Sequence, residues 1–199
     1  MVHKPNSGRI EHLGRLREVA LGCVRCPLAA GRTQVVFGDG DPDARLAVVG
    51  EAPGREEDAT GRPFLGAAGK NLDLFLTGIG LERKDVYIAN VAMCRPPENR
   101  PVRRAEMLAC ASHLDDQIEL VEPAVVIALG ESATKRFLGM DATVRGSRGQ
   151  AHQVGRALVV PTYHPSPLSL NRAPERRMHI ESDFRLALSL LLAHPASGH

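Results

Sequence analysis

Four cysteines have the most specific chemistry of any residues in this chain. Cys23 and Cys26 form a C-x2-C pair, and Cys94 and Cys110 follow with fifteen residues between them. Four thiolates can hold a structural zinc ion or an iron–sulfur cluster, and the spacing alone does not separate these two alternatives. Free cysteine is also common in apolar cores, so two or three unrelated buried cysteines are a third interpretation.

Acidic residues cluster in a loop that directly follows an apolar run, residues 46–49. The loop consists of Gly50-Glu51-Ala52-Pro53-Gly54-Arg55-Glu56-Glu57-Asp58 and continues through Gly61-Arg62-Pro63-Phe64. A short apolar run bounded by glycine is typical of a buried strand, and ligands bind at strand ends in open α/β sheets. A loop of proline, glycine and charge can equally be a plain surface connection, so these residues alone support both interpretations.

Two further polar residues end apolar runs. Asn90 follows residues 86–89, and His164 lies in Tyr163-His-Pro-Ser-Pro-Leu168 just after residues 158–161. A side-chain amide offers both a donor and an acceptor, and an imidazole can stabilise a developing anion. Taken singly, an asparagine at a strand end is more commonly a turn residue, and a histidine before proline is usually incidental.

The elements that would position these residues alternate between strands and helices. Apolar runs predict strands at 46–49, 86–89, 124–130 and 158–161. Helical periodicity predicts helices at about 68–79, 105–121, 132–138 and 180–192, after a first helix that Ser7 could cap. This order predicts a three-layer α/β/α sandwich with a central, mostly parallel four-stranded sheet. One domain would span residues 1–199, with Pro195–His199 as a frayed tail.

Composition sets the broad class of protein. The chain has 199 residues, of which 43% are hydrophobic and 24% charged, with a net charge of +2. The mildly basic balance permits nucleic-acid binding without requiring it. Because no apolar stretch approaches the ~20 residues of a membrane span and the first ten residues lack a signal-peptide core, we expect a cytoplasmic protein without structural disulfides.

Several motifs occur together and in one order. They are Gly50-Glu-Ala-Pro-Gly-Arg-Glu-Glu-Asp58, Gly61-Arg-Pro-Phe64, Asn90 with Cys94-Arg-Pro-Pro-Glu-Asn-Arg100, and His164-Pro-Ser-Pro-Leu168. With the four cysteines, this set resembles the family 4 uracil-DNA glycosylases, the bacterial and archaeal iron–sulfur type. The resemblance covers roughly residues 20 to 190 and implies a monofunctional enzyme that removes uracil from single- or double-stranded DNA.

The resemblance implies roles for residues that would surround a flipped base. Phe64 would stack on the uracil, and the Asn90 amide would match uracil O4 and N3–H. His164 would face uracil O2 and stabilise the departing uracilate. Ser166 would hold a DNA phosphate, and Leu168 would wedge into the vacated base stack. Without the resemblance, Phe64 would be interpreted as a core residue under the loop.

The acidic loop is where the water-activating residue is expected. Relatives in the broader superfamily place an aspartate where this chain has Ala52, so the activator is uncertain and Glu51 is the first candidate. A carboxylate here could also stabilise oxocarbenium character at the sugar. Glu57 and Asp58 match acids of the family as well, with a structural role in capping the loop as the alternative, and Glu56 is interpreted as solvated.

The resemblance also favours a [4Fe–4S] cluster held by Cys23, Cys26, Cys94 and Cys110. In that family the cluster is regarded as structural, and it would join the first helix and the proline-rich loop to the helix that carries Cys110. Uracil-containing DNA is the expected partner, with no membrane association, and the expected state is a monomer.

Other classes of function remain open at this level. A related cluster-containing subgroup binds uracil-DNA and becomes covalently trapped, but it carries Gly-Glu-Gln-Pro-Gly and an inserted Lys-Arg-Arg-Ile-His loop, whereas this chain has Ala52 and no such loop after Cys94. A glycosylase with a broader range of deaminated bases is another alternative. A zinc-stabilised nucleic-acid module without catalysis is the third.

Overall fold

The computed structural model describes residues 7–194, and the expected tail at Pro195–His199 lies outside this range. A six-stranded sheet forms the centre, with strand order β1-β3-β2-β4-β6-β5. The strands are β1 (Asp39–Gly40), β2 (Leu46–Gly50), β3 (Tyr87–Asn90), β4 (Val125–Leu129), β5 (His152–Val154) and β6 (Ala157–Thr162). The four central strands are parallel, and β1 and β5 pair antiparallel at the two edges.

The predicted α/β sandwich is confirmed, but the four-stranded count is wrong. The four predicted strands are the central parallel ones, and both missed strands lie at the edges. β1 has two residues and β5 has three, and both are partly exposed. Such short edge strands carry no continuous apolar run, because only strands buried on both faces require one.

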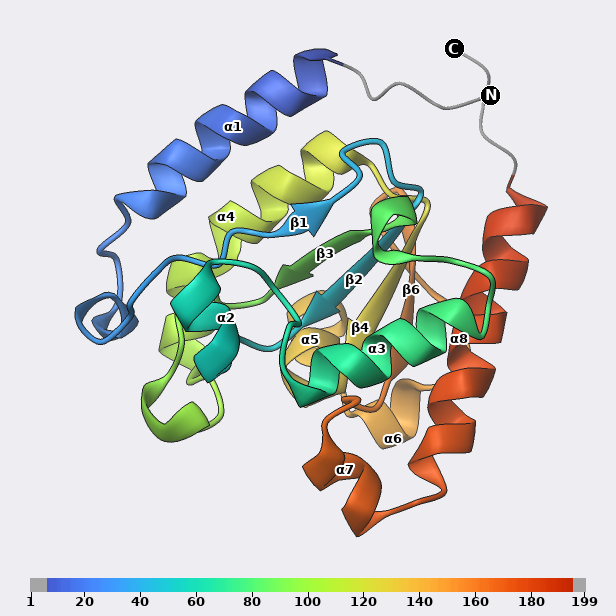
Figure 1. Cartoon of the computed structure of the whole chain (residues 1–199). Coiled ribbons are helices and arrows are strands. Elements are labelled where there is room, and N and C mark those ends of the chain that lie inside the picture. The colour runs from blue at the N-terminus through green and yellow to red at the C-terminus, as the bar shows by residue number, and fades with distance from the viewer. Residues whose placement is uncertain (1–6, 195–199) are drawn as a thin grey trace.

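Helices cover both faces of the sheet (Figure 1). They are α1 (Ser7–Leu21), α2 (Arg55–Thr60), α3 (Ala67–Thr77), α4 (Arg104–Val121), α5 (Gly130–Leu138), α6 (Val144–Ser147), α7 (Pro167–Arg172) and α8 (Arg176–Ala193). In β2, Ala47 and Val49 belong to the core beneath α4, while Leu46 and Val48 belong to the core beneath α3 and α8. This alternation follows from the two-residue period of a strand and produces two separate cores.

Two segments expected to be irregular contain short helices. The acidic loop forms α2, which Gly61 ends in a left-handed conformation with φ of 73°. The proline-rich segment contains the 3-10 helix Pro97–Asn99, in which Glu98 and Asn99 have positive φ. Within residues 7–194, no helix is long and apolar enough to cross a membrane.

Candidate active site

A cavity of about 550 Å³ opens at the carboxyl ends of the parallel strands, the edge where open α/β sheets bind ligands. Its volume lies within the range of small-molecule sites. Most of the expected site residues line it: Glu51, Ala52, Glu57, Phe64, Asn90, His164, Ser166 and Leu168. Asp58 lies outside this lining. The loops after β2, β3 and β6 therefore meet at one pocket, as the resemblance implied.

Asn90 and Phe64 line the pocket, and Gly50 packs directly against both of their side chains. Gly50 pairs with Asn90 across β2 and β3. A Cβ at Gly50 would lie 2.4 Å from the Phe64 ring and 2.7 Å from Asn90 Oδ1, so only glycine leaves room for both side chains. Asn90 is 2% exposed, and its Oδ1 has no hydrogen-bond partner. A buried, unsatisfied polar atom is costly, and this one is available to a ligand in the pocket.

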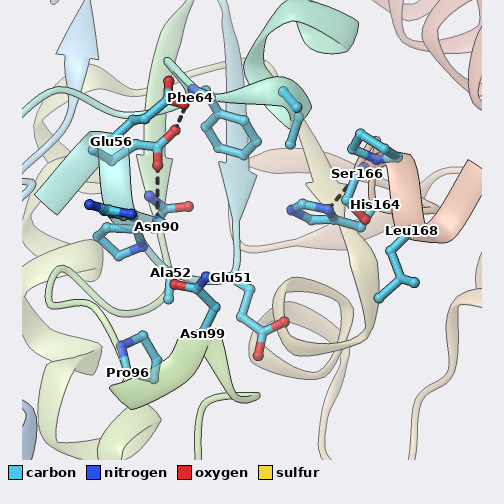
Figure 2. A pocket seen from close by; sticks show the side chains of 18 of the residues that line it. Glu51, Ala52, Glu56, Phe64, Asn90, Pro96, Asn99, His164, Ser166 and Leu168 are labelled. Atoms are coloured by element: carbon cyan, nitrogen blue, oxygen red, sulfur yellow. Dashed lines mark hydrogen bonds between the residues drawn. The ribbon is translucent and has the colours of Figure 1, made fainter.

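Phe64 supplies an aromatic wall. Figure 2 shows its ring above and between the Asn90 amide on one side and the His164 ring on the other. The two ring centroids lie 6.1 Å apart with an interplanar angle of 28°. Phe64 has a φ of 54°, a left-handed backbone conformation that bulky residues rarely adopt. Backbone strain of this kind persists where the surrounding structure enforces it, commonly at functional sites.

His164 is held in one tautomer. The backbone N–H of Ser166 donates to His164 Nδ1 at 3.2 Å, so the ring proton resides on Nε2. Burial lowers the pKa of His164 to about 4, although the nearby Glu57 acts to raise it. The ring is therefore neutral near pH 7 and can donate one hydrogen bond from Nε2.

Glu51 continues from β2 into the pocket and is anchored to the opposite loop. Val102 N donates to Glu51 Oε1 at 2.7 Å, just before α4 begins. This contact uses one carboxylate oxygen and leaves the other for a further partner. In Figure 2 the carboxylate points away from Phe64, and Ala52 lies beside it without a group that could activate water.

Glu57 and Asp58 bind the backbone. Glu57 accepts from Gly54 N at 3.0 Å and from Leu65 N and Gly66 N at 2.8 Å each, and Asp58 accepts from Thr33 N at 2.9 Å. Both side chains are buried. These contacts correspond to the structural alternative from the sequence, because a carboxylate that satisfies two or three buried N–H groups stabilises the loop that contains it.

Ser166 and Leu168 lie at the rim. The Ser166 hydroxyl caps α7 by accepting from Ser169 N at 3.3 Å. Leu168 is 63% exposed on that helix, and its side chain points away from His164 in Figure 2. A single exposed leucine is common on protein surfaces, so its place at the rim of the pocket, rather than its exposure, makes it a candidate for contact with a substrate.

The four cysteines lie close together next to α4, the helix that carries Cys110. They are free thiols and line one cavity of about 20 Å³ with Arg25, Arg32 and His113. Guanidinium groups donate to two sulfurs at 3.4 Å, Arg25 to Cys23 and Arg32 to Cys94. Among residues 7–194, no group of three or more His, Cys, Asp or Glu side chains meets the geometry for a single metal ion.

The surroundings raise the pKa of two of these thiols and lower the pKa of a third. Burial raises the pKa of Cys110 to about 11 and raises that of Cys94, where the Arg32 hydrogen bond opposes it. For Cys23, burial acts upward but hydrogen bonds from Arg25 outweigh it and lower the pKa. Four thiols with two guanidinium groups beside their sulfurs suit a thiolate-bound metal centre, because the arginines offset the negative charge of the thiolate ligands.

Comparison with known proteins decides the family. A profile of the Uracil DNA glycosylase superfamily matches residues 37–185. Two curated relatives are each named type-4 uracil-DNA glycosylase. The Thermotoga maritima protein is 44% identical over 85% of this chain and 89% of its own length, and the Sulfurisphaera tokodaii protein is 39% identical over 88% and 83%. This chain belongs to the type-4 family of uracil-DNA glycosylases.

This chain is also more similar to its type-4 relatives than to a type-5 relative. A type-5 uracil-DNA glycosylase of Pyrobaculum aerophilum is 34% identical over 85% of this chain and 88% of its own length. That identity is lower than for the type-4 relatives, over comparable coverage. The family resemblance inferred from the motifs is therefore confirmed.

Sequence reasoning missed several residues that build the pocket of this family member. Arg55, Pro96 and Asn99 line it, and Asn71 Nδ2 on α3 donates to Pro165 O at 2.8 Å, which anchors the loop after His164. Asn71 stands only two residues beyond Gly69 in a glycine-containing helix start, but no local pattern shows that it reaches a loop nearly one hundred residues away. Such contacts appear only once the chain is folded.

Three arginines near the motif loops bind other groups of the protein itself. Arg100 donates to both carboxylate oxygens of Glu106 at 2.8 and 2.5 Å, and Arg176 donates to Ser169 Oγ at 3.0 Å. Arg95 Nε donates to Asn99 Oδ1 at 2.8 Å. These contacts order the loops that flank the pocket, so the arginines shape the mouth of the site whatever else they bind.

Proposed function

We propose that this protein is a monofunctional uracil-DNA glycosylase that flips uracil out of DNA and hydrolyses its N-glycosidic bond, leaving an abasic site. The observation that carries the proposal is the meeting of Phe64, Asn90 and His164 at one pocket, from three segments that are far apart in the chain. A base inside a duplex must be extruded before its sugar bond can be reached. The pocket offers a stacking face, an edge reader and a neutral donor for such a base.

Asn90 reads the base. An amide can accept from uracil N3–H and donate to O4 at once, whereas cytosine presents a bare N3 and an amino group. Its Oδ1 is buried and unpartnered, so a cytosine would leave it unsatisfied in a dry site. Phe64 stacks on the base, a contact worth ~1–3 kcal/mol in single-stranded nucleic-acid binding.

His164 stabilises the leaving group. As the C–N bond breaks, negative charge develops on uracil O2, and the neutral imidazole donates its Nε2–H to that oxygen. Because Ser166 N already holds Nδ1, the ring is oriented before the substrate binds. Such preorganised donors are commonly the largest single contribution to catalysis.

Glu51 is the carboxylate we assign to the water and sugar side. Its second oxygen can orient a water toward C1′, and its charge favours the oxocarbenium character of the sugar. Ala52 provides no alternative acid at the next position. Glu57 and Asp58 act through the loop, since both oxygens of Glu57 and Oδ1 of Asp58 accept backbone N–H groups.

The cysteine cavity is assigned to a structural [4Fe–4S] cluster held by Cys23, Cys26, Cys94 and Cys110. When bound, the cluster would supply no step of base removal, and its four cysteine ligands would join the segment after α1, the proline-rich segment and α4. The fit rests on the donor set of four thiols around one cavity with two guanidinium groups on their sulfurs. We further propose that the protein works as a cytoplasmic monomer on uracil-containing DNA.

A direct assay tests the activity. Purified protein is incubated with a labelled oligonucleotide that holds one uracil, as a single strand and paired with G or A, and is then treated with alkali. We expect a break at the uracil position only after alkali, and none in a matched thymine oligonucleotide. An intact uracil strand in all three contexts contradicts the proposal. An SDS-stable protein–DNA adduct in place of product would identify a trapping protein instead.

A further inference from the structure

The Phe64 turn requires an external support. Its φ of 54° is unfavourable for a bulky side chain, yet the ring must be held beside Gly50 and the Asn90 amide. The turn also packs tightly against α3, since a Cβ at Gly69 would lie 1.7 Å from Phe64 O. This carbonyl contacts Arg83 and packs against Gly69, and neither of these residues lines the pocket.

Arg83 provides that support. It lies in the short 3-10 helix Arg83–Asp85 before β3 and is absent from the pocket lining. Its guanidinium donates to Pro63 O at 3.1 Å, to Phe64 O in a very short contact, and to Gly69 O at 3.4 Å. One planar group therefore joins both sides of the strained turn to α3.

The guanidinium is itself held in place. Arg83 Nε donates to Asp73 Oδ1 at 2.5 Å from the middle of α3. Its side chain is only 26% exposed. Arginine presents several donors in a rigid plane, whereas lysine has a single flexible ammonium. The site thus uses the geometry of arginine as well as its charge.

We propose that Arg83 is a positioning residue for base stacking, which holds Phe64 in its left-handed conformation so that the ring meets a flipped uracil. This inference rests on the proposed function of the pocket. Arg83 is absent from the pocket lining, so its effect on base stacking must pass through the groups that it contacts, foremost the Phe64 carbonyl. That requirement separates it from a residue that merely stabilises the fold.

A double-mutant cycle tests the proposal. The single-turnover rate of uracil release is measured at saturating protein for the wild type, Arg83→Met, Phe64→Ala and the double variant. We expect Arg83→Met to slow release roughly 10- to 100-fold, as for a small misplacement of a positioning group. In the Phe64→Ala background the same change should have almost no further effect, because the ring that Arg83 positions is already absent.

Control variants make the outcome specific. Lys84→Met changes the neighbouring cation, which forms an exposed ion pair with Glu82, and should leave the rate unchanged. Arg83→Lys keeps the charge and should restore the rate only in part; it also replaces Arg83→Met in the cycle if that variant does not fold. An equal loss in both backgrounds, or a Phe64→Ala variant as fast as the wild type, would overturn the proposal. A wild type that releases no uracil would instead contradict the proposed function.

Discussion

At the scale of single residues, the pocket is distinguished by polar side-chain atoms that remain available to a substrate. Asn90 Oδ1 is one of the few buried side-chain atoms of residues 7–194 that make no hydrogen bond. His164 differs, because its Nδ1 is used by Ser166 N and only Nε2 remains to act. One residue is thus poised to read a base and the other to receive charge.

Asn90→Asp should reduce uracil release by roughly 10- to 100-fold and narrow the preference for uracil over cytosine. The change removes the amide donor and buries a charge, and losing such a partner costs ~1–3 kcal/mol. Release rates on uracil and cytosine oligonucleotides measure both effects. Gln153→Glu on the edge strand β5 is the matched amide-to-acid control and should leave both rates unchanged. An unaltered preference in Asn90→Asp would remove this residue from base reading.

His164 should make the folded protein less stable as the pH falls. Its pKa lies at about 4 when folded and at the ordinary 6.5 when unfolded, so the unfolded chain binds more protons between these values. The contribution is therefore fully present above pH 6.5 and is lost as the pH falls toward 4. His164→Gln should show a smaller drop in melting temperature between pH 7 and pH 4.5 than the wild type. Parallel curves for the two proteins would contradict the assigned shift.

His164 also makes a kinetic prediction that is separate from folding. His164→Ala should slow the single-turnover cleavage step much more than it weakens binding of uracil DNA, because the hydrogen bond strengthens as charge reaches O2. Removing one preorganised donor typically costs ~10²–10³ in rate. Binding is measured by fluorescence anisotropy on a non-cleavable analogue. Equal rates for variant and wild type would exclude His164 from the mechanism.

At the scale of elements, α3 connects the two walls of the pocket. Gly69 in its first turn packs against Phe64 O, and Asn71 donates to Pro165 O in the loop after β6. The two loops are nearly one hundred residues apart in the chain. A single helix therefore sets the distance between the stacking ring and His164.

Gly69→Ala should lower both stability and activity. The added methyl group would lie 1.7 Å from Phe64 O and 2.2 Å from its carbonyl carbon, and both are backbone atoms that cannot move aside alone. Overpacking of this kind costs about 1–3 kcal/mol. Gly14→Ala is the control, since nothing lies within 4 Å of that position and alanine favours a helix interior by about 1 kcal/mol. Thermal unfolding of both variants measures the contrast, and a neutral Gly69→Ala would show that the turn can shift.

At the scale of the whole molecule, α4 and the proline-rich stretch before it connect the pocket with the cysteine cavity. Val102 N, which lies just before α4, donates a hydrogen bond to Glu51 Oε1, and Cys110 lies on that helix. Cys94 precedes the proline-rich stretch, whose Pro96 and Asn99 line the pocket. Constraining the cysteines therefore also constrains one wall of the candidate active site.

Cys110→Ser should abolish the colour expected of a cluster and destabilise the protein. A bound [4Fe–4S] group gives a brown protein with broad absorbance near ~400 nm, whereas a zinc site is colourless. Metal binding of this kind contributes directly to the free energy of folding, so the melting temperature should fall. Iron and sulfide analysis of the wild type provides the reference. A colourless wild-type protein that contains zinc would contradict the cluster assignment and identify a zinc site instead.

The sequence predicted the four central strands, because a strand buried on both faces must be a near-continuous apolar run. The edge strands β1 and β5 lack such runs and were missed. The helix α2 was missed for a different reason. Its six residues are mostly charged, and it depends on Glu57 binding the backbone of Gly54, Leu65 and Gly66, a contact set that spans a loop.

The sequence by itself determined the layered fold, the family and the residues that end the parallel strands, because these depend on local periodicity and on motifs of fixed spacing. Only the tertiary structure decided which acids reach the pocket, how His164 is oriented and that Arg83 supports Phe64. Those features arise from contacts between residues far apart in the chain, whose partners no local pattern encodes. Asp58 illustrates the same reason. The sequence offered it as a candidate substrate-binding residue, whereas in the structure its carboxylate accepts a hydrogen bond from Thr33 N on a distant segment and anchors the backbone.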